Sequence, residues 1–311
     1  MRASLRQAYG EALVELGEKN RNVVAMDADL GKSTMSCLFQ NAFPERYFQM
    51  GIAEQNMLST AAGLALGGKI PFVSTFAVFA TGRPYDQIRS SIAIAGLHVV
   101  ICGSSAGLSD YGDGKTHQSI DDIALMRVLP HMQVYCPCDA VSVKGLMPLL
   151  AEGSGPAYLR VSRADLPVVY QGGEDFREGL FRLRDGKDAV VFACGTMVHE
   201  SLKAAELLEK QGISVRVVDL YRIKPLNYEA LLREAEGMQS IVTAEEHNVH
   251  AGMGSAVAEA LGKVGMVGVQ DCYGTSASNY EELLVRYHLT DKDIAAKVVE
   301  MLGTAYTRFH G

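Results

Sequence analysis

The strongest constraint on the fold is the alternation of short, apolar, β-rich runs with helical runs along the chain. A first series predicts buried strands and intervening helices, with strands at 22–27, 70–76, 97–103, 132–136 and 157–163 and helices at 83–95 and 140–151. A second series has strands at 188–195, 215–220 and 240–246 and helices at 198–211, 228–236 and 255–264. Apolar strands separated by helices are typical of parallel sheets with crossover helices. The sequence therefore predicts an α/β protein with two parallel-sheet domains.

The segment 166–187 differs from both series because it is rich in glycine, proline and charge, with YQGGEDFREG at its centre. We interpret it as the connection between a first domain at 1–165 and a smaller second domain at 188–311. A chain of 311 residues is long enough for two domains that each bury a core of their own.

Composition excludes several functional classes. A formal net charge of −7 gives no basic surface for nucleic acid. No apolar run reaches the roughly 18 residues needed to span a bilayer, and residues 1–20 lack the apolar core of a signal peptide. The six cysteines do not have the density of a disulfide framework. We expect a cytoplasmic protein without a membrane partner.

Three patterns that resemble cofactor or metal motifs are better explained without a ligand. Cys136-Pro-Cys138 lacks the two-residue spacer of redox and zinc pairs. The run Gly252-Met-Gly254-Ser-Ala-Val257 ends in valine where a dinucleotide fingerprint needs a small residue. His247 and His250 lie beside two glutamates, but the segment does not complete a coordination set. We interpret both histidines as loop residues or as residues of a domain contact.

The run GIAEQNM at 51–57 places one carboxylate, Glu54, directly before an apolar stretch of small residues. Ile52, Ala53 and Met57 would desolvate this carboxylate and disfavour its ionised form, which makes it a candidate catalytic acid. A first-turn glutamate that favours a helix N-terminus explains the spacing equally well.

This run, followed by FVSTFAVF at 72–79, resembles the pyrimidine-binding domain of the transketolase family of thiamine-diphosphate enzymes. The resemblance implies that Glu54 hydrogen-bonds N1′ of the cofactor's aminopyrimidine. It also implies that Phe76 stacks on that ring and that Phe79 lines the same pocket. A flat heterocycle suits an aromatic contact, although two phenylalanines near a strand end also fit an ordinary core.

A second run, GDGKTHQS at 112–119, resembles the sugar-binding loop of the same family. It implies that Asp113 binds a sugar hydroxyl and that His117 contacts the reacting carbonyl or the C1 hydroxyl. Imidazole suits this work because its pKa lies near neutrality. From the residues alone, the segment is also compatible with a turn that ends in an N-capping Thr116 or Ser119.

Candidate phosphate ligands come from three further runs. RVSRADL at 160–166 resembles the family segment whose arginine binds the sugar phosphate, which implies this role for Arg163. Arg2 and Ser33 are weaker candidates from RAS at 2–4 and DADLGKST at 27–34. The sequence departs from the family near Ser105, where many members carry a histidine, and at Lys115 and Ser119, which replace prolines. The acceptor preference therefore stays open.

The family holds the cofactor's diphosphate through Mg²⁺ or Ca²⁺, bound by a Gly-Asp-Gly stretch and a later asparagine pair. Gly112-Asp113-Gly114 matches the first part, but 139–145 contains no asparagine, so this run belongs to the sugar loop. The resemblance therefore implies the C-terminal subunit of a split, two-chain transketolase, with no metal ligand of its own. We expect an N-terminal partner subunit, an α2β2 assembly with the cofactor between subunits, and a second domain that supports structure and dimerisation.

The predicted activity is the transfer of a two-carbon ketol unit between sugar phosphates, as in the pentose phosphate pathway. Three alternatives remain: the β subunit of a 2-oxoacid dehydrogenase, a deoxyxylulose-phosphate synthase-like enzyme, and a non-catalytic scaffold. GDGKTHQ argues against the dehydrogenase, the split chain against the synthase, and the presence of Glu54 beside Phe76 and His117 against the scaffold.

Overall fold

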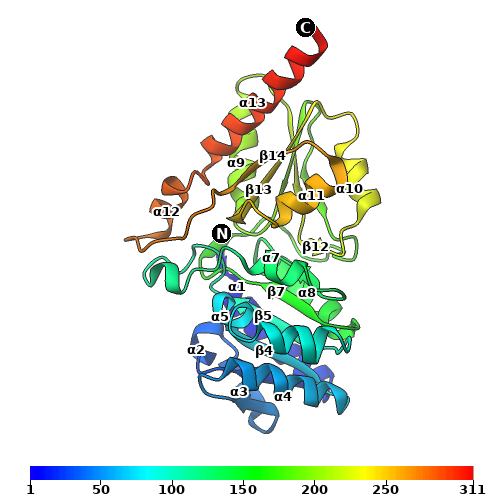
Figure 1. Cartoon of the computed structure of the whole chain (residues 1–311), viewed down its shortest axis with the longest axis vertical. Helices are drawn as coiled ribbons and strands as arrows, with labels where there is room; N and C mark the ends of the chain where they lie inside the picture. Colours follow the sequence, from blue (N-terminus) through cyan, green and yellow to red (C-terminus); the bar gives the residue numbers. More distant parts are fainter. Residues whose placement is uncertain (311) are drawn as a thin grey trace.

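The computed structural model describes residues 1–310, with side chains described as far as Gly303. Two α/β domains follow one another along the long axis of the molecule (Figure 1). This confirms the predicted fold class. No helix in the described part of the chain is long and apolar enough to cross a membrane.

The sheet of the first domain has the order β12-β6-β7-β5-β4-β2-β3. Its strands are β2 (Val23–Asp27), β3 (Tyr47–Gln49), β4 (Ile70–Phe76), β5 (Val100–Ser104), β6 (Gln133–Tyr135), β7 (Ala157–Arg160) and β12 (Arg222–Lys224). Neighbouring strands are parallel except at β12, which pairs antiparallel with β6. β12 comes from the second half of the chain, so that half completes the edge of the first sheet.

The second domain contains a sheet of order β14-β13-β10-β11-β9. Its strands are β9 (Phe181–Arg184), β10 (Ala189–Ala193), β11 (Val215–Asp219), β13 (Ser240–Asn248) and β14 (Gly265–Val269). Two short strands, β1 (Arg2–Ser4) and β8 (Asp165–Pro167), form a separate antiparallel pair. The segment expected to connect the domains therefore contributes β9, an antiparallel edge strand, to the second sheet.

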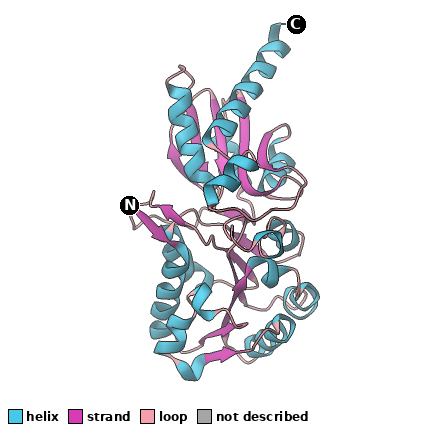
Figure 2. Cartoon of the chain, turned by 90° about the vertical axis from the view of Figure 1, so that its left-hand side faces the viewer, coloured by secondary structure: helices cyan, strands magenta, loops and turns pink. Residues whose placement is uncertain are grey.

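Helices cover both faces of the first sheet (Figure 2). In this half of the chain they are α1 (Leu5–Lys19), α2 (Gly31–Thr34), α3 (Cys37–Ala42), α4 (Glu54–Leu66), α5 (Ala77–Thr81), α6 (Tyr85–Gln87), α7 (Asp122–Arg127) and α8 (Ala140–Glu152). The side chains along β4 explain this layering. Phe72 packs in one hydrophobic cluster and Val73, on the opposite face, packs in the other. Strands buried on both faces need a helical layer on each side.

The second domain carries α9 (Met197–Glu209), α10 (Tyr228–Ala235), α11 (Met253–Leu261), α12 (Tyr280–Arg286) and α13 (Asp291–His310). Several of these begin with a capping side chain. At α10, for example, the Asn227 side chain accepts from the backbone N–H of Ala230. In the first domain, Asp139 and Ser142 form a capping box that fixes the start of α8.

The helix predicted at 83–95 is shorter in the structure and is largely a π-helix. The structure has the short α6 followed by a π-helix at Ile88–Ala93. Pro84 explains the late start because the residue before a proline is disfavoured in helical conformation, so Arg83 stays outside the helix.

Candidate active site

The predicted site residues follow the carboxyl ends of neighbouring parallel strands. Phe76 is the last residue of β4, and Phe79 lies in α5 immediately after it. His117 follows β5 along the chain, and Arg163 follows β7. Because parallel strands end at the same edge of a sheet, the topology gathers these segments at one place, where open α/β sheets bind ligands.

Glu54 is the first residue of α4, and it is only 4% exposed. Arg83 Nη1 donates a 2.7 Å hydrogen bond to Glu54 Oε1. A pocket of about 410 Å³ opens beside this pair, lined by Ile52, Ala53, Glu54, Gln55, Asn56 and Arg83. Glu54 therefore lies in the first turn of a helix, where a carboxylate is favourable, and it also lines a pocket. Ile52, expected to help desolvate the carboxylate, is instead 74% exposed and lines the pocket.

Aromatic contacts connect this carboxylate to His117. The Arg83 guanidinium lies 4.0 Å from the centroid of the Phe79 ring. Phe79 is stacked with Phe76 at 6.0 Å and meets the His117 ring edge-on at 5.3 Å. The structure therefore brings Glu54, Phe76, Phe79 and His117 together through contacts in series.

The sequence analysis missed Arg83 as a member of this group. A basic residue shortly after the aromatic pair at 76–79 was the available signal. The sequence pattern predicts Arg83 at the start of a helix and does not indicate that its side chain contacts Glu54.

The sugar loop forms a short 3₁₀ turn at Gly114–Thr116, directly before His117. The Thr116 hydroxyl and His117 Nδ1 are 3.0 Å apart, which orients the ring, and Asp113 is exposed at the start of the turn. The predicted caps Thr116 and Ser119 do not cap the next helix, which begins after Asp121 without a side-chain cap. The 3₁₀ turn and the pairing of Ser119 with Gly107 place both too early in the chain for that role.

Arg163 Nη1 donates to Asp110 Oδ2 at 2.9 Å, and its backbone N–H donates to the Ser109 hydroxyl at 3.0 Å. Asp110 is buried, so desolvation raises the pKa of its carboxyl, while Arg163 opposes that shift. Asp113 also raises the pKa of Asp110, and the backbone N–H of Gly114 donates to the Asp110 carbonyl at 3.4 Å. Asp110 therefore links Arg163 to the His117 turn.

Arg6 is a further cation that the sequence analysis missed. Its Nη1 donates to the Ser33 carbonyl at 2.8 Å. Burial and then the positive charge of Arg163 lower the pKa of Arg6. Arg2 is bound differently: its guanidinium donates to the carbonyl of Asp165, and it lines a small pocket with Thr196 and Tyr280 of the second domain.

Ser105, at the place of the histidine found in many transketolases, is fully buried with φ of 52°. Its hydroxyl has no hydrogen-bond partner among the described residues. Lys115 is exposed and Ser119 is buried. The loop at this place therefore presents no substitute for an imidazole.

The motifs set aside in the sequence have structural roles. The carboxylate of Glu245 accepts from the backbone N–H groups of Met253 and Gly254, so it occupies the N-terminus of α11. His247 is buried, and its Nε2 lies 3.4 Å from the backbone N–H of Ala124, across the domain contact. No group of three or more His, Cys, Asp or Glu in the described part of the chain could hold a metal ion.

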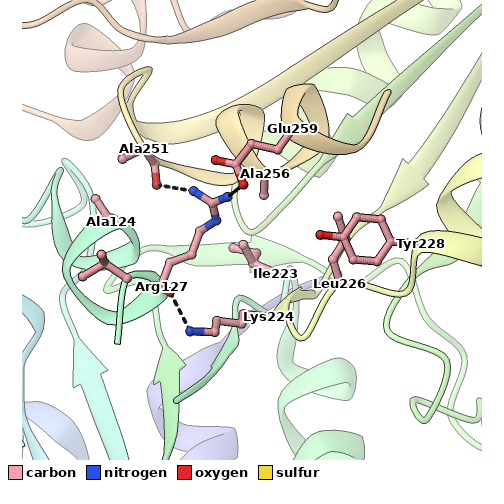
Figure 3. Close-up of a pocket in the computed structure, with 10 residues that line it drawn as sticks. Ala124, Arg127, Ile223, Lys224, Leu226, Tyr228, Ala251, Ala256 and Glu259 are labelled. Carbon is pink, nitrogen blue, oxygen red and sulfur yellow. Dashed lines mark hydrogen bonds and ion pairs between the residues drawn. The ribbon is translucent and has the colours of Figure 1, made fainter. Parts of the chain in front are cut away.

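A second pocket, of about 520 Å³, lies between the two domains and contains none of the predicted site residues (Figure 3). Arg127 at the end of α7 spans it to reach Ala251 and Glu259 of the second domain. Lys224 Nζ donates to the carbonyls of Arg127 and Leu129. The cationic side chains of this pocket, Arg127 and Lys224, are therefore used in contacts that join the two domains.

Residues 2–169 match the family model of the transketolase pyrimidine binding domain, and residues 180–294 match that of the transketolase C-terminal domain. The chain belongs to the transketolase family. It is 40% identical to a putative transketolase C-terminal section of Methanocaldococcus jannaschii, over 95% of each chain. It is 38% identical to the 6-deoxy-6-sulfo-D-fructose transketolase subunit SqwH of a Clostridium species, over 96% of this chain and 94% of that one.

Longer relatives and solved structures agree with the family. Human transketolase is 39% identical over 82% of this chain, and the match covers 42% of the human protein. A structure described as a split gene transketolase, inactive beta4 tetramer, superimposes with a TM-score of 0.88 at 46% identity, over 97% of this chain and 98% of that one. The transketolase of Leishmania mexicana shares the fold, with a TM-score of 0.84 at 22% identity, over 97% of this chain and 46% of its own.

Proposed function

We propose that this chain is the pyrimidine-binding subunit of a thiamine-diphosphate-dependent transketolase that moves a two-carbon ketol unit between sugar phosphates. The observation that carries the proposal is the contact series from the buried carboxylate of Glu54 to the ring of His117. It joins an acid, a stacked aromatic pair and an imidazole at one edge of the sheet.

The residues present fit the aminopyrimidine of the cofactor. Among the described residues only Arg83 hydrogen-bonds the Glu54 carboxylate, through Oε1, which leaves Oε2 to bond a ring nitrogen. Phe76 and Phe79 offer an apolar, polarisable surface for a flat ring. The cofactor would supply the nucleophilic carbon to which the ketol unit is attached. Mg²⁺ or Ca²⁺ would be held, with the diphosphate, by the partner subunit.

On the substrate side, each residue acts through chemistry suited to its type. His117 donates a proton to, or accepts one from, the oxygen of the reacting carbonyl. Asp113, exposed at the start of the 3₁₀ turn, accepts hydrogen bonds from sugar hydroxyls. Arg163 binds the sugar phosphate, with Arg6 as a second positive charge nearby and Ser33 beside it. Arg2 is the weakest candidate because it lines a separate small pocket with Thr196 and Tyr280.

A separate N-terminal subunit is part of this proposal. Two similar proteins support it: one is described as a C-terminal section and the other as a split gene product that is inactive as a beta4 tetramer. We expect an α2β2 assembly, because closed two-fold symmetry is the commonest arrangement of soluble oligomers. The run GDGKTHQ argues against the 2-oxoacid dehydrogenase alternative.

The experiment compares the purified chain with its mixture with a candidate partner that carries Gly-Asp-Gly and a later asparagine pair. Calorimetry measures thiamine-diphosphate binding with and without Mg²⁺, and a coupled assay measures ketol transfer. We expect neither binding nor turnover from the chain alone, and both from the mixture. Stoichiometric, Mg²⁺-dependent binding by the chain alone would contradict the proposal. A control mixture with Glu54→Gln distinguishes failed assembly from failed chemistry.

A further inference from the structure

The second domain holds the loop that carries Asp113 and His117, here called the His117 loop (residues 107–121). The central contact is the carboxylate of Glu246 on β13, which is 2% exposed. Glu246 Oε1 accepts from the backbone N–H of Leu108 at 2.8 Å. The same carboxylate accepts from the Tyr280 hydroxyl at 2.7 Å and from the Thr196 hydroxyl at 2.9 Å, both in the second domain. One side chain therefore ties the start of the loop to two elements of the other domain.

The contact is close enough to restrict the loop sterically. A Cβ atom added at Gly107 would lie 2.4 Å from the Glu246 carboxylate, so only glycine fits there. Gly107 also has φ of 67°, which glycine adopts without strain. Gly107 pairs with Ser119 across the base of the loop. Because Gly107 pairs with Ser119, holding Gly107 and Leu108 in place also holds the opposite side of the loop's base.

Further hydrogen bonds from the second domain reach the rest of the loop. The Asn248 N–H donates to the Ile120 carbonyl at 2.8 Å, and the Ala277 N–H donates to the Tyr111 carbonyl at 2.9 Å. The Gln118 side chain donates to the Thr275 carbonyl at 2.9 Å. These bonds hold the loop on both sides of the turn that carries Asp113 and His117.

The segment after the loop is held in the same way. Arg127, at the end of α7, donates to the Ala251 carbonyl and pairs with Glu259 (Figure 3). Arg160 is buried and donates to the carbonyls of Ser119 and Glu246, so its side chain joins the loop to β13. The second domain therefore contacts the loop at its start, its turn and its end.

We propose that Glu246 is a positioning residue, through which the second domain sets the place of His117 in the active site. This inference rests on the proposed function, because it assumes that His117 touches the substrate. It assigns to the second domain a part in catalysis beyond supporting structure and dimerisation. A displacement of about 1 Å in a reacting geometry costs up to about 100-fold in rate, so the position of the loop base matters.

The chemistry of Glu246 allows a matched pair of variants. Desolvation raises the pKa of Glu246, and the Arg160 guanidinium opposes that shift. Glutamine keeps the shape and can make the same bonds, since its oxygen accepts from Leu108 and Tyr280 and its amide donates to Thr196. Alanine removes the acceptor and leaves these donors without their partner. Glu246→Gln should therefore keep the hydrogen bonds to the His117 loop and to the second domain that Glu246→Ala removes.

Two measurements test the proposal. The first is hydrogen exchange of peptides covering 107–121 in the full chain, which does not depend on activity. The second is kcat and KM of the assembled enzyme, together with its affinity for thiamine diphosphate. We expect Glu246→Ala to raise exchange in the loop and to lower kcat by about 10- to 100-fold, with cofactor affinity unchanged. Glu246→Gln should keep both near wild type.

Glu245→Gln is the control because Glu245 is a buried carboxylate on the same strand, bonded within the second domain. One carboxylate oxygen becomes an NH2 that cannot accept from the backbone N–H it meets, so exchange should rise at the start of α11, while exchange of the His117 loop and kcat stay near wild type. If Glu246→Ala does not fold, Glu246→Asp withdraws the carboxylate from the Leu108 N–H with less loss of packing and carries the same expectations.

Unchanged exchange in the loop would overturn the proposal, as would faster exchange with an unchanged kcat. If His117→Ala itself keeps the wild-type kcat, the proposed role of His117 fails instead, and with it the catalytic part of this inference. The exchange result still decides whether Glu246 holds the loop.

Discussion

The guanidinium of Arg163 lies 2.9 Å from the carboxylate of Asp110, with the Arg163 side chain 40% exposed and Asp110 buried. One edge of the guanidinium is therefore fixed by the protein while the rest can meet a ligand. A cation held in this way loses less conformational entropy on binding an anion than a free side chain does. Asp110 thus orients Arg163 for the phosphate that we propose it binds.

Arg163→Ala should raise KM for phosphorylated sugars far more than for an unphosphorylated donor such as hydroxypyruvate. The expected difference is a charge-assisted contact worth about 1.5–3 kcal/mol, lost only for phosphorylated substrates. Steady-state kinetics with both donor types measures it. Arg163→Lys is the matched variant, which keeps the charge but loses the bidentate geometry. An equal rise in KM for both donors would exclude the phosphate role.

Glu54→Gln should reduce turnover of the assembled enzyme by about 10²- to 10⁴-fold, because it removes an acid–base group while keeping the side-chain shape. Arg83→Met is the control, since it breaks the 2.7 Å bond to Glu54 but leaves the carboxylate in place. Its effect on kcat should be much smaller. Single-turnover kinetics separates the chemical step from assembly, and wild-type turnover of Glu54→Gln contradicts the assignment.

His117→Ala should lower kcat for phosphorylated and unphosphorylated substrates alike, by about 10²-fold or more. The reason is that the reacting carbonyl is common to all donors. His250→Ala serves as the control because His250 is an exposed histidine on the second domain. If kcat does not change, the packing of His117 against Phe79 is its only role.

Asp219 predicts a pH dependence of stability. Its carboxyl is fully buried between the Tyr170 hydroxyl, which donates at 2.8 Å, and the Cys138 thiol, with Asp139 nearby. Desolvation raises the pKa of Asp219 to about 7. The folded state therefore binds more protons than the unfolded state between about pH 4 and 7, and stability falls as the pH rises through this range.

The slope that Asp219 contributes reaches about −1.4 kcal/mol per pH unit. Asp219→Asn should remove this contribution because the amide does not ionise. Denaturant unfolding from pH 5 to pH 8 measures the free energy of unfolding of both proteins. Identical slopes for the wild type and the variant would show that Asp219 does not hold its proton in the folded state.

The sequence predicts best where a motif is contiguous. Glu54 and Phe76 sit in short runs at a helix start and a strand end, and those elements form where their apolar patterns indicate. Arg83 and Arg6 were missed because their partners lie 29 and 27 residues away, a pairing that only the tertiary fold creates. The role of Glu246 was missed for the same reason, since its partner Leu108 is 138 residues away.

The secondary structure was likewise predicted well where the sequence signal is local and missed where it depends on distant pairing. The long buried strands were predicted within a few residues because continuous apolar runs mark them. β12 was not predicted, since three residues carry no periodicity and the strand exists only through its pairing with β6. The π-helix at Ile88–Ala93 was missed because the sequence pattern there reads as an ordinary helix.

β12 also determines whether the two domains can be separated into stable fragments. A chain cut within 170–180 would leave β6 as an open edge, with unpaired backbone N–H and C=O groups exposed to water. The first fragment would then tend to pair with other chains, and the second would carry an orphan strand. Although two family models divide the sequence, β12 crosses that division, so we expect neither region to be exchangeable between proteins without the other.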